Sequence, residues 1–178
     1  MNNGRNIVNL ALIGFMGTGK SSVGRLVADQ LRFEFLDTDD QIESRAGKTI
    51  NDIFTQNGES TFRELECHLV EELANRTHMV ISTGGGLPVN PANLASLKCH
   101  ALVVCLWSSP EKILERVRDQ SHRPLLRDPD PLTKIRSLLT AREPFYKQAD
   151  VLINSEFRSV REVAQQVILQ YRMASGQK

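Results

Sequence analysis

The feature that most constrains this chain is a glycine-rich segment, Gly14 to Ser21 (GFMGTGKS), which fits the phosphate-binding loop G-x-x-x-x-G-K-[ST] at every specified position. Such a loop joins a strand to a helix, and the surroundings fit. Residues 7–13 are mostly apolar and read as a strand, and residues 21–31 place apolar side chains near helical spacing. The alternative is a plain glycine-rich turn between a strand and a helix.

The loop predicts a bound phosphate group. Successive backbone N–H groups form an anion-binding concavity, and the following helix adds the positive end of its dipole. Lys20 is expected to reach the β- and γ-phosphates, and the hydroxyl of Ser21 is expected to bind Mg²⁺. The expected nucleotide-binding positions in this segment are Gly14, Gly17, Thr18, Gly19, Lys20, Ser21 and Ser22.

Strand and helix signals alternate along the rest of the chain, which predicts an α/β fold with a parallel sheet covered by helices on both faces. Strands are expected at residues 7–13, 33–36, 79–82, 101–106 and 151–154. Helices are expected at residues 21–31, 41–46, 49–56, 60–74, 110–117 and 160–173, with Ser60 as a cap of the fourth.

Composition fits one globular domain over residues 1–178, because 40% of the residues are hydrophobic. A net charge of +1 gives no indication of a nucleic-acid or charged-membrane partner. Three widely spaced cysteines do not form a disulfide framework or a zinc site, and Cys105 reads as a core residue. No apolar run approaches the roughly 18 residues of a membrane span, so we expect a soluble, cytoplasmic protein.

A second chemical cluster, Asp37, Asp39 and Asp40, follows the second predicted strand. The carboxyl ends of parallel strands face the ligand crevice, so these carboxylates are candidates for holding Mg²⁺ through water or orienting an attacking hydroxyl. The alternative is that Asp39 or Asp40 caps the next helix.

Three further features have both a functional and a structural interpretation. Gly84 to Gly86 ends another strand and would let the backbone approach a ligand, or else forms a flexible turn. Arg63 has Glu66 at i+3, which would fix its direction, whereas a single arginine is more often solvated. The arginine- and proline-rich stretch 116–131 is either a lid over the substrate or a surface loop.

Taken in order along nearly the whole chain, these motifs resemble the shikimate kinase family. They are the phosphate loop, Asp37-Thr38-Asp39, the run from Asn51 through Gly58 to Glu66, Gly84 to Gly86, Arg123 to Leu126, and Arg142 to Tyr146. The resemblance implies a P-loop, nucleoside-monophosphate-kinase-like fold with a five-stranded parallel sheet. It also implies transfer of the ATP γ-phosphoryl group to the 3-hydroxyl of shikimate, in the pathway to chorismate and the aromatic amino acids.

The resemblance also assigns residues. Shikimate would be bound within residues 37–66 and beyond, by Asp39, Phe54, Phe62, Arg63, Gly84, Gly85, Gly86 and Arg142. Ser21 and Asp37 would hold Mg²⁺, Lys20, Asp39 and Arg123 would act in catalysis, and Arg123 would come from the lid. The adenine would lie by Arg116 and Arg158. We expect a monomer whose partners are ATP and shikimate.

Two rival functions remain. Another small-molecule kinase of this fold, for gluconate or a nucleoside monophosphate, would not need Asp39, Arg63 and Arg142 as a set. A GTP-dependent switch would need an N-K-x-D segment to read guanine, and no lysine here follows an asparagine.

Overall fold

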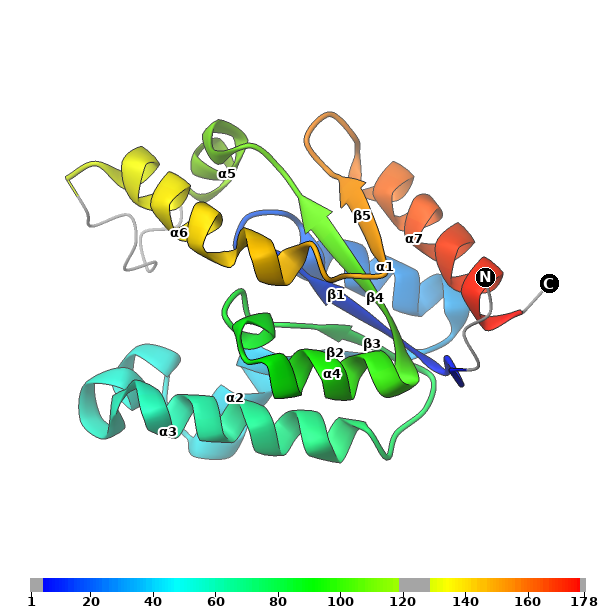
Figure 1. Cartoon of the computed structure of the whole chain (residues 1–178), viewed down its shortest axis with the longest axis horizontal. Coiled ribbons are helices and arrows are strands. Elements are labelled where there is room, and N and C mark those ends of the chain that lie inside the picture. Colours follow the sequence, from blue (N-terminus) through cyan, green and yellow to red (C-terminus); the bar gives the residue numbers. More distant parts are fainter. Residues whose placement is uncertain (1–4, 119–128, 177–178) are drawn as a thin grey trace.

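The computed structural model describes residues 5–118 and 129–176, which form a five-stranded sheet flanked by helices (Figure 1). All strand pairs are parallel, and the strand order is β2-β3-β1-β4-β5. This confirms the predicted α/β fold. The strands are β1 (Asn9–Ile13), β2 (Glu34–Asp37), β3 (Met79–Ser82), β4 (Ala101–Trp107) and β5 (Val151–Asn154).

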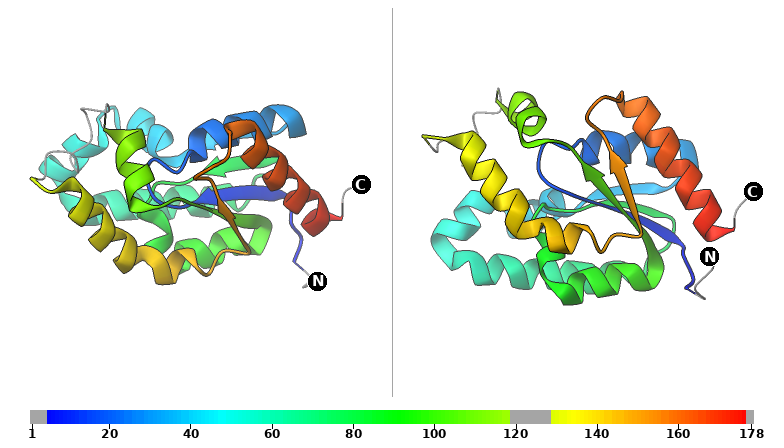
Figure 2. Two further views of the ribbon diagram at one scale, coloured as in Figure 1. Left: turned by 90° about the horizontal axis from the view of Figure 1, so that it is seen from above. Right: turned by 45° about the horizontal axis from the view of Figure 1, so that its top comes forward.

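Helices connect the strands and cover both faces of the sheet (Figure 2). They are α1 (Lys20–Leu31), α2 (Thr38–Ala46), α3 (Ile50–Leu73), the 3-10 turn η1 (Leu87–Val89), α4 (Pro91–His100), α5 (Pro110–Val117), α6 (Pro131–Tyr146) and α7 (Val160–Ser175). Among the described residues, no helix has the length and apolar character needed to cross a bilayer.

The central strand β1 is buried throughout, and its side chains alternate between two cores. Leu10 and Leu12 pack with α1 and α7 on one face, whereas Ala11 and Ile13 pack with α3, α4 and α6 on the other. Burial on both faces is what an all-parallel sheet requires.

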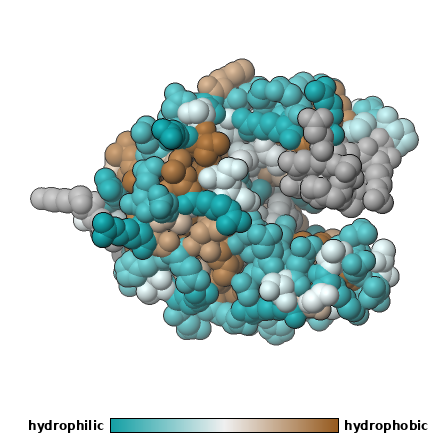
Figure 3. Space-filling model, turned by 180° about the vertical axis from the view of Figure 1, so that it is seen from behind, coloured by the Kyte–Doolittle hydropathy of each residue, from teal (hydrophilic) through white to brown (hydrophobic). Residues whose placement is uncertain are grey.

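The strand register brings the functional loops to one edge. Leu12 lies level with Ser82, which lies level with Asp37, and Ile13 lies level with Cys105. The phosphate loop, the aspartates that follow β2 and the glycines that follow β3 therefore leave the sheet side by side. The molecule is hollowed at this edge, between α2 and α3 on one side and α5 and α6 on the other (Figure 3).

Helix α3 consists of two helical pieces that meet at a kink. Gly58, with φ 84° and ψ 165°, is not helical, which confirms the predicted break between residues 49–56 and 60–74, although no loop separates the two pieces. Thr49 caps this helix by accepting a hydrogen bond from the backbone N–H of Asp52. Ser60 lies inside the helix, so the prediction that it is a cap was wrong.

The sequence did not predict two of the helices, and a third starts earlier than expected. Neither α4 nor α6 was predicted, although each begins with a side-chain cap followed by proline, Asn90-Pro91 and Asp130-Pro131. Pro131 was included in the stretch read as a lid or surface loop, and residues 87–100 received no assignment. Neither helix has a clear apolar stripe. Helix α2 starts at Thr38 rather than at residue 41, so Asp39 and Asp40 lie within its first turn.

Candidate active site

The phosphate loop runs from β1 into α1 through three glycines with left-handed φ angles. These are 132° at Gly14, 74° at Gly17 and 94° at Gly19, values that side chains other than glycine rarely adopt. Gly14 also passes so close to β4 that a Cβ atom there would overlap the carbonyl oxygen of Leu106. The loop therefore needs its glycines for both conformation and space.

Lys20, the first residue of α1, lies folded into the loop. Its Nζ atom donates hydrogen bonds of 2.9 Å to the carbonyl oxygens of Gly14 and Phe15, and the residue is 8% exposed. Thr18 supports the same turn by donating from Oγ1 to the Phe15 carbonyl at 2.8 Å. The ammonium group is thus held at the centre of the loop, where the loop's N–H groups would gather phosphate oxygens.

Ser21 and Asp37, the predicted Mg²⁺ pair, lie in contact. The Ser21 hydroxyl donates to Oδ2 of Asp37 at 2.7 Å and lies 3.4 Å from the hydroxyl of Ser82. The other carboxylate oxygen of Asp37 accepts from the backbone N–H of Asp39 at 3.1 Å and caps α2. The cap expected at Asp39 or Asp40 is therefore at Asp37.

These oxygen atoms suit Mg²⁺, which is usually bound through one or two carboxylates, with waters and substrate phosphates completing the shell. No group of three or more His, Cys, Asp or Glu side chains able to hold a metal occurs among residues 5–118 and 129–176. The donor set therefore fits a cation shared with a phosphate ligand better than a metal bound by protein alone.

Asp39 is the most strongly perturbed carboxylate of the site. Its pKa is raised from 3.8 to about 6, mainly by burial and then by the neighbouring charge of Asp37, while Lys20 opposes the shift. Its Oδ1 atom is buried and has no hydrogen-bond partner within the described part of the chain. An unpartnered acceptor with a raised pKa is the arrangement expected of a group that receives a hydrogen bond from a ligand hydroxyl.

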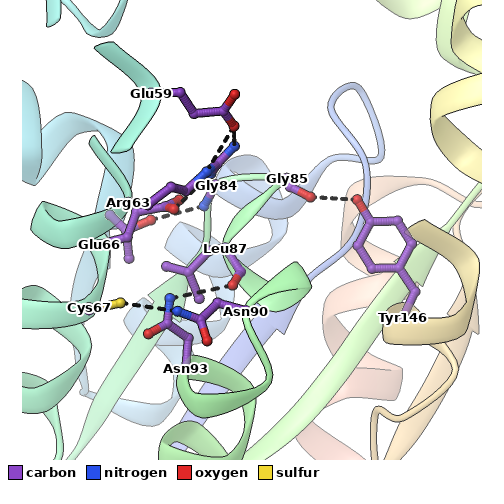
Figure 4. A network of polar contacts seen from close by, with 11 residues as sticks. Glu59, Arg63, Glu66, Cys67, Gly84, Gly85, Leu87, Asn90, Asn93 and Tyr146 are labelled. Carbon is purple, nitrogen blue, oxygen red and sulfur yellow. Dashed lines mark hydrogen bonds and ion pairs between the residues drawn. The ribbon is translucent and has the colours of Figure 1, made fainter. Parts of the chain in front are cut away.

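Arg63 is held by two glutamates on its own helix, α3 (Figure 4). Nε and Nη2 donate to Glu59 at 3.1 and 2.6 Å, and Nη1 donates to Glu66 at 2.7 Å. Glu66 is 1% exposed, and its Oε1 atom has no partner among the described residues. Burial raises the pKa of Glu66, while Arg63 and then Arg142 lower it. The expected i, i+3 pair is thus confirmed.

Each glycine of the turn after β3 lies beneath a different functional side chain. A Cβ atom on Gly84 would overlap Oδ1 of Asp39, and one on Gly86 would lie 2.8 Å from Nη1 of Arg63. At Gly85 it would meet Nη1 of Arg142 at 3.4 Å. The turn therefore brings side chains from α2, α3 and α6 together on one short segment of backbone without side chains. Of the two interpretations of these glycines, this arrangement supports a backbone that a ligand can approach closely rather than a flexible turn.

Helix α6 is fixed to this strip by Tyr146. Its hydroxyl donates to the carbonyl oxygen of Gly85 at 2.7 Å (Figure 4). Burial raises the pKa of Tyr146 to about 12, so it is a neutral donor at physiological pH. Arg142, one turn earlier, lies over the ring of Phe15 in the phosphate loop, with its Cζ atom 5.5 Å from the ring centroid. One helix thus touches both the glycine turn and the phosphate loop.

The two predicted aromatic residues form a pair on α3. The ring centroids of Phe54 and Phe62 are 5.0 Å apart. Phe62 is buried beneath Arg63, with the guanidinium carbon 5.4 Å from its ring centroid, whereas Phe54 is 36% exposed. Phe62 is thus mainly a core residue that supports Arg63, and Phe54 offers the open apolar surface.

Of the predicted nucleotide-side arginines, Arg116 lies against the phosphate loop. Its guanidinium donates to the carbonyl oxygen of Ser155 at 2.6 Å and to that of Gly17 at 3.3 Å. Arg158 is exposed in the segment after β5 and donates to the carbonyl of Asn154 at 2.6 Å. Arg123 and most of the predicted lid lie outside the described residues.

Thr38 and Tyr146 are also parts of the site, although the sequence did not predict a role for them. Thr38 is fully buried, and its Oγ1 accepts from the backbone N–H of Gly84 at 2.9 Å, which ties the aspartate segment to the glycine turn. A usable signal existed for Tyr146, because it lies four residues after Arg142 and so on the same face of a helix. Because α6 was not predicted to be a helix, the spacing of four residues did not indicate a shared face.

Comparison with known proteins adds an independent result. A model of the shikimate kinase family matches residues 16–172. The shikimate kinase of Thermodesulfovibrio yellowstonii is 41% identical over 96% of this chain and 98% of its own length. That of Thermoanaerobacter pseudethanolicus is 44% identical over 94% of this chain and 99% of its own length.

Solved structures agree. The shikimate kinase of Acinetobacter baumannii in complex with shikimate covers 98% of this chain and 97% of its own, with a TM-score of 0.89 and 38% identity. A gluconokinase from Sinorhizobium meliloti covers 97% of this chain and 96% of its own, but with a TM-score of 0.62 and 18% identity it shares the fold alone. From the family match and the full-length relatives, the chain belongs to the shikimate kinase family.

Proposed function

We propose that this protein transfers the γ-phosphoryl group of ATP to the 3-hydroxyl of shikimate, giving shikimate 3-phosphate and ADP. The observation that carries the proposal is the placement of Asp39, Arg63 and Arg142 on the glycine turn beside the phosphate loop. Membership of the shikimate kinase family supports the same reaction. A ring bearing one carboxylate and three hydroxyls needs both cations and a hydroxyl acceptor, and this set supplies both.

On the acceptor side, Arg63 and Arg142 would bind the carboxylate of shikimate. A guanidinium matches a carboxylate through two parallel hydrogen bonds, which gives orientation as well as attraction. Glu59 and Glu66 use three of the N–H donations of Arg63, and they hold its side chain in place before substrate arrives. Gly85 would contribute its backbone N–H, and Phe54 an apolar wall.

Asp39 would receive the 3-hydroxyl. Its carboxylate would orient that hydroxyl towards the phosphate loop. It would also stabilise the positive charge that the hydroxyl group gains as its oxygen attacks phosphorus. A pKa of about 6 leaves it mostly ionised at pH 7.5, so it is ready to accept a hydrogen bond.

On the donor side, Lys20 and the loop N–H groups would hold the β- and γ-phosphates, because phosphoryl transfer needs mainly alignment and charge stabilisation. Ser21, with Asp37 through water, would hold Mg²⁺, which when bound neutralises phosphate charge. Arg116 and Arg158 would flank the adenine, and Arg123 would reach the phosphates from a lid approximately at 116–131. The use of ATP supports a cytoplasmic location.

A panel of acceptors tests the proposal directly. ADP release is coupled to NADH oxidation with shikimate, quinate, gluconate and AMP as acceptors, and with ATP or GTP as donor. We expect turnover with ATP and shikimate and little with the other acceptors. Preference for gluconate would favour the rival kinase that shares this fold, and binding of GTP without transfer to any acceptor would favour the switch.

A further inference from the structure

A groove of about 440 Å³ lies between α6 and the ends of β4 and β5, on the face of the sheet that packs beneath α3 and α4. Figures 1 and 2 show α6 crossing this end of the sheet. The groove is separate from the residues assigned to ATP and shikimate, except that Tyr146 forms part of its wall. Its volume lies within the range of roughly 300–1,000 Å³ that is typical of small-molecule sites.

The floor of the groove is built by strand register. Cys105 pairs with Leu152 and Trp107 pairs with Asn154, so four side chains on the same face form two neighbouring rows. Trp107 is 43% exposed and Leu152 is 52% exposed. Both are large apolar side chains that the described helices leave partly open, although the rest of this face is packed beneath α3, α4 and α6.

The wall is one stripe of α6, with Arg136, Leu139, Thr140, Glu143 and Lys147 at helical spacing. Two cations and one anion therefore rim an apolar floor. Arg136 pairs with Glu111 at 2.5 Å, and Lys147 pairs with Glu143 at 2.7 Å. All four of these side chains are more than half exposed. Exposed pairs of this kind contribute little, so both cations can turn to a ligand at small cost.

The groove also contains an orphaned polar group. Ser108, at the end of β4, lines it and is 1% exposed, and its Oγ atom has no hydrogen-bond partner in the described part of the chain. Buried hydroxyl groups are normally paired. The Ser108 oxygen is itself covered, so a ligand atom or a water completes its bonding once a neighbouring side chain moves aside.

We propose that this groove is a second ligand site, which takes a small amphipathic anion with a flat apolar ring. The ring packs on Trp107 and Leu152, the acidic group meets Arg136 or Lys147, and a polar atom of the ligand pairs with Ser108. The site needs no part of the proposed kinase reaction.

The groove has a direct connection to the glycine turn. Tyr146 forms part of its wall and donates to the carbonyl of Gly85, and α6 also carries Arg142. A ligand that shifts α6 therefore changes the turn that is proposed to bind shikimate. By reciprocity, shikimate then changes the affinity of the groove for its ligand. This link, unlike the site, rests on the proposed function.

The test uses 8-anilinonaphthalene-1-sulfonate, which has flat aromatic rings and one sulfonate. Trp107 is the chain's one tryptophan, so energy transfer from its emission to the dye reports binding, and substitutions in the groove show whether the dye binds there. We expect saturable binding that Leu152→Glu weakens by at least about tenfold and Lys147→Glu by about threefold or more. Leu169→Glu, an exposed apolar position on α7, is the matched control and should stay within about twofold.

Circular dichroism and thermal melting establish that each variant is folded, and Lys147→Glu at an exposed position keeps the test valid if Leu152→Glu unfolds. No saturable transfer from Trp107, or equal loss in the Leu169→Glu control, would overturn the site. A changed dye affinity in saturating shikimate supports the link through Tyr146, and an unchanged affinity overturns the link alone. Failure of the acceptor assay, in contrast, would bear on the proposed function and leave the dye result intact.

Discussion

Replacing Asp39 by Asn should make the protein more stable and, at the same time, a much poorer kinase. Burial is the main cause of the raised pKa of Asp39, and the charge of Asp37 adds to it. At pH 7.5 the carboxylate is mostly ionised in surroundings that disfavour its charge. The buried charge of Asp39 therefore lowers the free energy of unfolding, and replacing the carboxylate by a neutral amide removes this destabilisation.

The size of the effect follows from the two pKa values. A rise from 3.8 in the unfolded chain to about 6 in the folded protein corresponds to about 3 kcal/mol, at 1.36 kcal/mol for each pH unit. The amide N–H group enters a position where Oδ1 has no partner, which costs about 1–3 kcal/mol. We therefore expect a net gain of roughly 1 kcal/mol, and at most about 2, for Asp39→Asn at pH 7.5.

The sign depends on pH. A carboxyl group whose folded pKa is raised contributes most stability when it is protonated in both states, below about pH 3.8. That contribution is lost as the pH rises through about 6. The free energy of unfolding of Asp39→Asn minus that of the wild type should therefore be largest above pH 7 and become smaller as the pH falls towards 4.5.

Urea unfolding at several pH values, without Mg²⁺ or nucleotide, measures this difference. Asp29→Asn, at an exposed position on α1, is the control and should change stability little at any pH. In parallel, kcat of Asp39→Asn with saturating Mg²⁺ and shikimate should fall strongly, and wild-type activity should fall as the pH drops below about 6. A difference that does not vary with pH would refute the reasoning, as would a variant less stable than the wild type at pH 8.

Four further changes test other parts of the site. Lys20→Ala should lower kcat by at least about 100-fold with the fold intact, and near-normal turnover would contradict the role of the phosphate loop. Arg63→Lys should raise KM for shikimate by about tenfold or more and leave KM for ATP nearly unchanged, since loss of one charged hydrogen bond costs about 1.5–3 kcal/mol. Arg45→Lys is the control, because the exposed Arg45 pairs with Glu72 through two hydrogen bonds. If Arg63→Lys changed KM for ATP as much as KM for shikimate, Arg63 would not act on the shikimate carboxylate. Asp37→Asn should raise the Mg²⁺ concentration needed for half-maximal rate and leave shikimate affinity largely intact, so an unchanged Mg²⁺ titration would exclude that role. Tyr146→Phe should raise KM for shikimate about 2–10-fold, because the carbonyl of Gly85 loses its donor, and an unchanged KM with lower thermal stability would mean that Tyr146 is structural only.

The sequence predicted the sheet and the phosphate loop well because both depend on local signals. Apolar runs marked the strands, and glycines that the turn geometry requires marked the loop. The two missed helices, α4 and α6, have caps and prolines at their starts but no strong apolar stripe, so their helical form depends on contacts with distant elements. The break at Gly58, in contrast, was predicted from a local signal, because a glycine readily adopts the non-helical φ of 84° found there.

The site shows a similar division. The pair of Arg63 and Glu66 follows from helical spacing and is confirmed as a contact. The contact of Ser21 with Asp37 fits the Mg²⁺ pair that the family resemblance implies. The bond from Tyr146 to Gly85 joins positions 61 residues apart. No spacing rule indicates such a contact, because it exists only once α6 is packed across the sheet.

If the proposed function holds, the side chains that lie over the glycine turn are what would select the acceptor. The gluconokinase from Sinorhizobium meliloti shares the fold at a TM-score of 0.62, so the fold alone does not single out an acceptor. Here Asp39, Arg63 and Arg142 each lie over a different glycine, close enough that a Cβ atom at two of the three would displace the side chain above it. The missing side chains at Gly84 and Gly86 allow a carboxylate and a guanidinium to approach the same short segment of backbone, so these glycines would be as much a part of the proposed acceptor site as the side chains above them.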